Sequence, residues 1–384
     1  MKHVIYVSAG DVSVYESQVL ELLDYLQSKE IKVTLLQGYK SDEEKKKLEK
    51  KLSNHPPVPT VWVKSFSVYP FYKKKMVDSF YKGITSIEGY HEAIFHVRSE
   101  YVGYCMKCVF QKYRLNLPML IDIRGIICEE LKYKQKQLIG KRKLLSSVQC
   151  VYLKSCYKRL FSPDNMRIAI SSVSSAINNY ISTNYPTCKY PKFVHSNIAG
   201  RQFVFDEGKR REIRQRYGIA DNEVLAVCST GGNAVWQKDH LVVKRLVEMG
   251  VRVINLSKIN IDIEGCITTT VPFTEMPAML SAADVAVLWR DDTFINNSAS
   301  PSKFSEFAAM GLYVIHNKTV QVAVEHIQST GAGCLVNNEE EINALPSYEE
   351  LQSQRQRWCE AGLSIFGVDS LGDSYIRKYD QLMN

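Results

Sequence analysis

The stretch RDDTFINNSASPSKFSEFAAMGLYVIHN, residues 290–317, decides the fold that we predict from the sequence. An apolar run, VAVLWR, leads into it, a helical pattern follows, and a second apolar run, LYVIHN, comes directly after Gly311. Glycine is common just beyond a helix end, so we expect the helix to close there. These signals predict a strand, a loop, a helix and a strand, which is the repeating unit of a parallel α/β sheet.

The start of this predicted helix has features of an anion site. Ser300 is a good N-cap residue, and Pro301 suits the first helical position. We therefore expect the unpaired backbone amides of the first turn to point into the preceding loop, where they attract phosphate.

The two sides of the predicted helix differ in chemistry. Ser302, Lys303 and Glu306 share one side at three- and four-residue spacing, a set that suits a nucleoside diphosphate and its ribose. The opposite side carries Phe304, Phe307 and Ala308. An ordinary strand–helix–strand unit with a solvated polar side would show the same pattern. These residues alone therefore do not distinguish a binding site from a structural unit.

Length and composition narrow the class of protein. At 384 residues the chain exceeds one ordinary core, so we expect two α/β domains. No apolar run approaches the ~20 residues that span a bilayer, and MKHVIYVSAG predicts a strand rather than a signal peptide, so we expect a cytoplasmic protein.

The ten cysteines are scattered, and the single CxxC pair, Cys105 and Cys108, lies in a helical pattern without further ligands, so we predict no metal site.

The net charge of +8 is unevenly distributed. Residues 1–196 hold 31 Lys and Arg against 17 Asp and Glu, a net of +14, whereas the remainder carries −6. Basic runs occur at 45–51, 73–75 and 132–143. Solvated helix faces would explain each run by itself, but together the runs favour an anionic membrane surface or another polyanion as a partner of the first half.

Strands alternate with helices along the chain, which predicts two doubly wound, Rossmann-like α/β domains that face each other across a cleft. We place the first domain at residues 1–198, the second at 199–365, and a helical tail at 366–384 that packs back toward the first domain. From 129 to about 160 the pattern is basic and helical, over one helix or two. Ligands in such folds bind beyond the carboxyl ends of the strands.

A glycine pair follows a predicted strand of the second domain. In VLAVCSTGGNAVWQKD, Gly231 and Gly232 let backbone amides approach a diphosphate, and Lys238 supplies a positive charge. A Gly-Gly turn is also a common structural connection between a strand and a helix. Because this turn and the 290–317 stretch belong to one predicted sheet, we expect both at one edge, with Arg290 as a further ligand.

These residues resemble the C-terminal domain of GT-B glycosyltransferases that use nucleotide sugars, particularly the retaining glycosyltransferase family four and its bacterial capsule and O-antigen members. The subgroup pattern Ser-Pro-x-Lys-Phe-x-Glu-Tyr-x-x-x-Gly-Leu-Pro-Val-Ile is matched at Ser300, Pro301, Lys303, Phe304, Glu306, Gly311, Leu312, Val314 and Ile315. Residues 17–26, 95–99 and 122–130, and Trp236 with Gln237, are similar to the same subgroup, so the resemblance covers most of the chain.

The resemblance implies a role for each domain. The second domain would bind a nucleotide-diphosphate sugar, UDP- or GDP-linked, as the donor. Glu306 would hold the ribose hydroxyls, while Ser302, Lys303, Lys238 and the helix amides would hold the diphosphate. The first domain would bind a glycan or lipid-linked glycan acceptor, and transfer would retain configuration, with a leaving phosphate oxygen helping to deprotonate the acceptor.

Two departures from the family pattern bear on the site, whereas Phe307 and Tyr313 replace the common Tyr and Pro conservatively. Family four usually carries two glutamates with seven residues between them; the second matches Glu306, and the first, which generally contacts the donor sugar, falls on Ser298. Many members also have a histidine after a first-domain strand, where Arg124 stands here. The identity of the sugar is therefore left open.

Polar residues follow several predicted strands of the first domain. The predicted acceptor-binding residues are Gly10, Asp11, His96, Arg98 and Arg124, and the predicted catalytic residues are His96, Arg124, Lys238, Lys303 and Glu306. A hydrogen-bonded histidine at a sheet edge is the plainer interpretation of His96, whereas unpaired guanidinium groups are seldom buried.

Glycosyl transfer needs relief of the charge on the departing diphosphate. No Asp-x-Asp metal motif is recognisable, since Asp291 and Asp292 are adjacent. We therefore predict a metal-independent transferase without a cofactor. In it, Lys238, Lys303 and the helix start would stabilise the negative charge of the departing diphosphate. We expect its acceptor to be a lipid-linked surface-polysaccharide intermediate, and the protein to be peripheral at the inner face of the cell membrane. A nucleotide-sugar epimerase of the same fold and a non-catalytic polyanion-binding subunit stay open as alternatives; no nucleic-acid-binding motif is recognisable.

Overall fold

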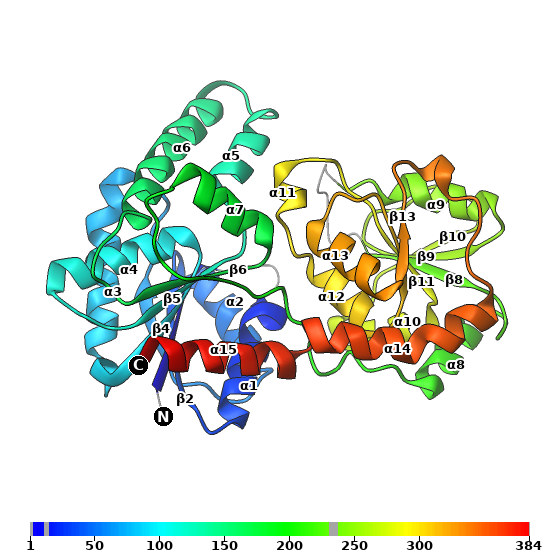
Figure 1. The fold of residues 1–384 in the computed structure, drawn as a ribbon, viewed down its shortest axis with the longest axis horizontal. Helices are drawn as coiled ribbons and strands as arrows, with labels where there is room; N and C mark the ends of the chain where they lie inside the picture. Colours follow the sequence, from blue (N-terminus) through cyan, green and yellow to red (C-terminus); the bar gives the residue numbers. More distant parts are fainter. Residues whose placement is uncertain (1–2, 11–14, 230–236, 384) are drawn as a thin grey trace. The chain divides into compact units, whose positions relative to one another are not determined.

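The computed structural model describes residues 3–10, 15–229 and 237–383, and the chain divides into two compact units. The first unit comprises Met1–His195 with Gly372–Asn384, and the second comprises Ser196–Leu371. Each unit contains one parallel sheet flanked by helices (Figure 1). The predicted fold class, two Rossmann-like α/β domains with a helical C-terminal segment, is confirmed.

The first unit has a seven-stranded sheet in the order β3-β2-β1-β4-β5-β6-β7. Its strands are β1 (His3–Ala9), β2 (Lys32–Tyr39), β3 (Thr60–Lys64), β4 (Ala93–Arg98), β5 (Met119–Ile123), β6 (Ile168–Ser172) and β7 (Lys192–Val194). Its helices are η1 (Glu16–Leu20), α1 (Glu21–Ser28), α2 (Asp42–Leu52), η2 (Pro70–Tyr72), α3 (Lys73–Thr85), η3 (Tyr90–Glu92), α4 (Glu100–Tyr113), α5 (Ile127–Gln135), α6 (Gly140–Leu160) and α7 (Ser175–Asn184). The basic segment predicted to be one helix or two forms two, α5 and α6.

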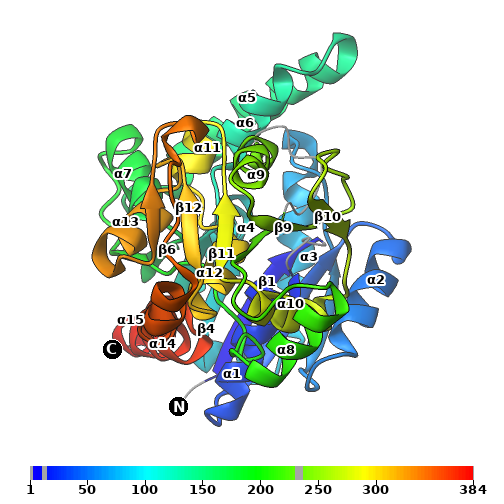
Figure 2. The ribbon, with the colours of Figure 1, turned by 90° about the vertical axis from the view of Figure 1, so that its right-hand side faces the viewer.

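The second unit has a six-stranded sheet in the order β10-β9-β8-β11-β12-β13 (Figure 2). Its strands are β8 (Leu225–Cys228), β9 (Arg252–Leu256), β10 (Cys266–Thr269), β11 (Val285–Leu288), β12 (Tyr313–His316) and β13 (Gly333–Leu335). Its helices are α8 (Glu207–Arg216), α9 (Asp239–Glu248), η4 (Phe273–Glu275), α10 (Met276–Ala282), α11 (Phe294–Asn297), α12 (Ser302–Ala309), α13 (Gln321–Thr330), η5 (Glu339–Glu341) and α14 (Tyr348–Phe366). The last helix, α15 (Val368–Met383), ends in the first unit.

None of the helices in the described ranges combines the length and the apolar character that a membrane crossing requires.

Helix α14 packs against α12 at backbone contact distance. A Cβ atom placed on Gly362 would lie 2.1 Å from the carbonyl oxygen of Ala308, and one on Gly311 would lie 2.3 Å from the carbonyl oxygen of Arg355. Gly311 also has a positive φ of 65° just beyond the end of α12, which confirms its predicted role in closing that helix. Glycine at both positions therefore sets how closely the two helices approach.

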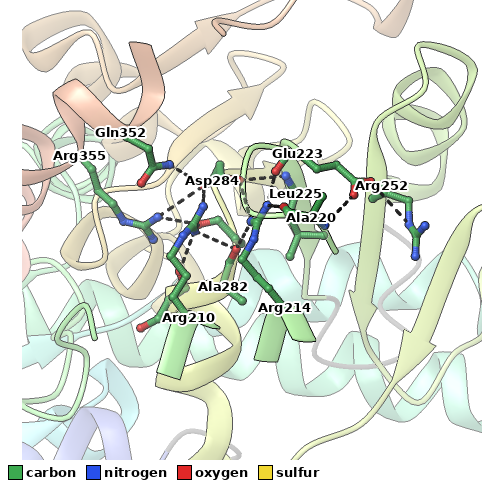
Figure 3. A network of polar contacts seen from close by, with 12 residues as sticks. Arg210, Arg214, Ala220, Glu223, Leu225, Arg252, Ala282, Asp284, Gln352 and Arg355 are labelled. Carbon is green, nitrogen blue, oxygen red and sulfur yellow. Dashed lines mark hydrogen bonds and ion pairs between the residues drawn. The ribbon is translucent and has the colours of Figure 1, made fainter. Parts of the chain in front are cut away.

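A buried carboxylate, that of Asp284, organises the amino ends of the second sheet (Figure 3). It lies 2.6 Å from Arg210, 3.3 Å from Arg214 and 3.7 Å from Arg355. It also accepts hydrogen bonds from the Leu225 amide and the Gln352 side chain. The three guanidinium groups donate further to backbone carbonyls of residues 280–283, where α10 ends, so each cation has both a charged and a backbone partner.

We predict that the substitution Asp284→Ala destabilises the second unit by about 3–5 kcal/mol, because it leaves three buried arginines without their carboxylate. Urea unfolding followed by circular dichroism measures this change. The exposed Asp221 provides the control, and Asp221→Ala should change the free energy of unfolding little. Equal losses in the two variants would contradict the assigned role of Asp284.

Candidate functional site

Most of the predicted site residues lie near the two places where the strand order reverses, whereas Arg124 follows β5, one strand further along the first sheet. In the first sheet this reversal lies between β1 and β4, and in the second between β8 and β11. Open α/β sheets bind ligands beyond the carboxyl ends of the strands at such a point. We describe the second unit first.

Helix α12 begins one residue later than predicted. Pro301 occupies its N-cap position, and Ser302, largely buried, is its first residue. The prediction of Ser300 as the N-cap is wrong, because its hydroxyl accepts a hydrogen bond from the Asn197 backbone amide at 2.9 Å instead. The Asn197 side chain in turn donates to the Ser300 carbonyl, so these two contacts fix the approach to the helix start.

The first turns of α12 carry a buried carboxylate beside a cation. Glu306 is 2% exposed, and its Oε2 lies 2.9 Å from the Lys303 ammonium. Burial raises the pKa of Glu306, while Lys303 acts against that rise. The Lys303 side chain keeps 25% of its surface exposed, so the cation reaches solvent while the carboxylate does not.

The other side of α12 faces the core, as predicted. Phe304, Phe307 and Ala308 are buried, and the Phe304 ring meets Phe366 edge to face at 5.5 Å. This packing holds the helix rigidly, so Lys303 and Glu306 project from a fixed backbone.

The segment that follows β8 returns to lie beside the segment that follows β11. Gln237 forms an antiparallel bridge with Arg290, and the Lys238 amide donates to the Trp289 carbonyl at 3.1 Å. Asp239 accepts a hydrogen bond from the Trp289 amide at 2.8 Å. These contacts place Lys238 at the carboxyl end of β11, at the start of α9, with a half-buried side chain.

Arg290 and Ser298 point into the protein. The Arg290 guanidinium lies 3.5 Å from the Asn296 side chain, and its buried Nε has no hydrogen-bond partner among the described residues. Burial lowers the pKa of Arg290, and Asp239 acts against that change. Ser298 is buried at the end of α11, where its hydroxyl donates to the Ile295 carbonyl at 3.4 Å.

Gly231, Gly232 and Trp236 from the predicted diphosphate turn, and Asp11 from the predicted acceptor site, lie outside the described residues. Their predicted roles stay predictions. In the described ranges, no three His, Cys, Asp or Glu side chains converge in a way that would hold a metal ion.

In the first unit, Gly10 and Arg98 lie at the strand-order reversal. Gly10 follows β1 with a φ of 85°, a conformation that favours glycine, and its amide donates to the Gly38 carbonyl. Arg98 ends β4 and donates to the side chain of Gln18 on η1. Both residues are largely buried, so they shape the carboxyl edge of the sheet more than they present a charged surface.

His96 and Arg124 share a buried acidic partner, Asp122. Arg124 Nε donates to Asp122 Oδ2 at 2.6 Å, and His96 Nε2 lies 3.5 Å from the same oxygen. Although burial favours the neutral acid, Arg124 and His96 hold the pKa of Asp122 well below its usual value. His96 is fully buried, so the prediction that it contacts a substrate finds no exposed surface in this conformation; burial also lowers its pKa.

Helix α15 supplies the other partners of this network. Tyr379 hydrogen-bonds to His96 Nδ1 at 2.6 Å, and the Tyr375 hydroxyl accepts from Arg124 at 3.2 Å. His195 stacks on the Tyr375 ring at 4.1 Å, and burial lowers the pKa of His195 to about 4. The two tyrosines thus connect the C-terminal helix to the polar residues of β4 and β5.

The sequence predictions missed Asp122, His195, Tyr375 and Tyr379. The signal for Asp122 was a carboxylate inside an otherwise apolar strand, where a buried charge requires a partner. The signal for the tyrosines was their four-residue spacing, which places both on one side of a helix. Neither signal identifies which strand the helix packs against.

Comparisons with solved structures give the same fold over the whole chain. A glycosyltransferase from Rickettsia africae shares 15% identity with a TM-score of 0.68, and the match covers 100% of this chain and 99% of the other. Sucrose-phosphate synthase from Thermosynechococcus elongatus shares 11% with a TM-score of 0.70 over 100% and 99%. The Anabaena protein HepE, solved with UDP, shares 12% with a TM-score of 0.63 over 99% and 100%.

No protein-family model and no curated protein matches the sequence. The chain therefore has the two-domain α/β fold of GT-B glycosyltransferases, and this statement rests on structure alone.

The buried Asp239 gives a pH-dependent prediction. Burial raises the pKa of Asp239 to about 6, above the 3.8 of an unperturbed aspartate, so between these pH values the unfolded chain releases a proton that the folded protein keeps. Relative to the variant Asp239→Asn, the wild-type protein should lose up to ~3 kcal/mol of stability as the pH rises through that window. Urea unfolding of both proteins at several pH values tests this difference, and parallel stability curves would contradict it.

Proposed function

We propose that the protein transfers a sugar from a nucleotide-diphosphate sugar to a glycan acceptor, with retention of configuration and without a metal ion. The observation that carries the proposal is the Lys303–Glu306 pair in the first turns of α12, next to the strand-order reversal of a GT-B fold. The Anabaena relative of this fold was solved with UDP and with UDP-glucose.

In this proposal the helix start and two lysines hold the donor diphosphate. The amides of the first turn and the Lys303 ammonium meet the phosphates, and Lys238 adds a second cation from the edge of β11. As the bond between the sugar and the diphosphate breaks, negative charge grows on the leaving oxygen, and these fixed groups stabilise it.

Glu306 is the proposed ribose ligand. An ionised carboxylate accepts hydrogen bonds from two adjacent hydroxyls, and Lys303 favours the ionised form in a buried setting. The partly exposed Lys303 ammonium would contact a diphosphate while it stays next to Glu306, and it would therefore keep that carboxylate ionised. Glu306 would then offer both oxygens to the ribose.

The first unit is the proposed acceptor-binding part. Arg124 retains 10% of its side-chain surface while paired to Asp122, and Arg98 and Gly10 shape the neighbouring strand ends. We assign His96 to positioning, because it connects Tyr379 to Asp122 without reaching the surface. A lipid-linked intermediate of a capsule or O-antigen is the proposed acceptor, on the resemblance to bacterial members of glycosyltransferase family four.

The donor can be identified by a thermal-shift panel of nucleotide sugars, in which we expect one donor to raise the melting temperature. A new epimer formed from that donor without an acceptor would instead support an epimerase. If no nucleotide sugar protects the protein while polyphosphate does, a non-catalytic polyanion-binding role replaces the proposal.

Two substitutions separate the proposed roles in donor binding. Lys303→Ala should weaken binding of the nucleoside diphosphate roughly 10- to 100-fold and leave binding of the free nucleoside unchanged, because only the phosphates meet the ammonium. Glu306→Ala should weaken binding of both ligands, because both contain the ribose. Isothermal titration calorimetry measures the four affinities.

Lys244→Ala and Glu248→Ala provide matched controls, since these residues form an exposed pair one turn apart on α9. Both control variants should bind like the wild-type protein. An equal loss of nucleoside and diphosphate binding in Lys303→Ala would contradict its phosphate role, and unchanged affinity in Glu306→Ala would contradict the ribose role.

A further inference from the structure

Helix α6 is apolar on two opposite sides, and only one of them is covered. The covered side carries Ser146, Cys150, Leu153 and Tyr157, and the helix packs against α4 and α5. The opposite side presents aliphatic side chains that are 45% to 70% exposed, and Ile139, just before the helix, is 86% exposed. We call this set the α6 apolar strip, which consists of Ile139, Leu144, Leu145, Val148 and Val151.

The strip is continuous along the helix. Leu144, Val148 and Val151 follow each other at four- and three-residue spacing, so their side chains lie in one row. Leu145 borders the row, and Ile139 precedes the first turn. Single exposed aliphatic residues are ordinary on protein surfaces, but a contiguous row of this kind marks a contact site.

The charges around the strip have one sign. Residues 131–163 contain nine Lys and Arg and no Asp or Glu. Lys141, Arg142 and Lys143 form the first turn of α6 and are exposed, and Lys134 and Lys154 are exposed on either side. In Figures 1 and 2 the ends of α5 and α6 project beyond the sheet of the first unit, so this surface stands away from the core of that unit.

We propose that the α5–α6 hairpin docks on an anionic lipid bilayer, with the α6 apolar strip in the interfacial layer and the basic side chains at the lipid phosphates. Amphipathic helices with aliphatic residues beside lysines and arginines lie in this way at membrane surfaces. The inference goes beyond the proposed function, because docking requires neither donor nor acceptor. It would hold the first unit where a lipid-linked acceptor is available.

The chemistry of the strip favours lipid over nucleic acid. Single-stranded nucleic acids stack on aromatic side chains, whereas the five members of this strip are all aliphatic. Aliphatic chains gain most from an apolar layer, and the uniform positive charge complements anionic headgroups.

Flotation of the full-length protein with vesicles tests the proposal in the absence of nucleotide. We expect stronger binding to phosphatidylcholine vesicles with about one-third phosphatidylglycerol than to phosphatidylcholine alone, and weaker binding at high salt. Lys141→Gln, Arg142→Gln and Lys143→Gln together should reduce binding on the order of 100-fold, since each basic residue contributes roughly fivefold at an anionic surface. Leu144→Ser with Val151→Ser should reduce it on the order of 10-fold.

The chain provides matched controls for both variants. Lys46→Gln, Lys47→Gln and Lys50→Gln on α2 remove the same charge from another exposed helix. Val204→Ser with Ile365→Ser removes two exposed aliphatic residues from the second unit. Both controls should bind like the wild-type protein.

Tryptophan fluorescence reports insertion directly. Val151→Trp should show a blue shift with anionic vesicles, and Val204→Trp should not. Equal binding to neutral and anionic vesicles, or equal losses in the variants and their controls, would overturn the proposal. The proposal would also be overturned if soluble polyphosphate competed with vesicles for the protein while the Leu144 and Val151 substitutions had no effect on vesicle binding. That result would indicate a polyanion site. Turnover with a soluble acceptor does not depend on whether the protein binds vesicles, so the vesicle test is separate from the test of the proposed function.

Discussion

The carboxylate of Asp284 is the constraint on which the second unit depends. Besides three arginines it holds the first residue of β8, and the Asp284 backbone carbonyl accepts from Tyr313 at the start of β12. One side chain and its backbone therefore align the amino ends of three adjacent strands. Because those strands are short and rigid, the alignment reaches their carboxyl ends, where the loops carrying Lys238 and Arg290 begin.

The two candidate binding regions differ in how firmly their cations are held. Arg124 is fixed by a short ion pair with Asp122 and a contact with Tyr375, whereas Lys303 has a flexible, partly exposed side chain beside Glu306. An incoming phosphate would have to compete with a carboxylate in either case. The cost is smaller at Lys303, because its side chain is more exposed than that of Arg124, 25% against 10%. This difference is consistent with the proposed diphosphate site in the second unit.

Local sequence patterns predicted the alternation of strands and helices, the end of α12 at Gly311 and the core-facing residues Phe304 and Phe307. These features depend on neighbours within a few positions. The Ser300 prediction failed because a distant amide, that of Asn197, binds its hydroxyl. Likewise the tyrosines of α15 meet His96 and Arg124 across more than two hundred positions, and no local pattern encodes such a pairing. The sequence did not predict the α6 apolar strip either. A helix with apolar residues on two opposite sides lacks the regular alternation of apolar and polar residues that identifies a buried side.

The glycine contact between α14 and α12 lets α14 influence the proposed donor site through the position of α12. With no room for even one methyl group at Gly362, the position of α12 is set by a backbone surface rather than by adaptable side chains. Side-chain packing can relax around an altered neighbour, but two helix backbones in contact can only separate or tilt. A larger residue in place of Gly362 would therefore shift α12 and change the direction of the Lys303 and Glu306 side chains.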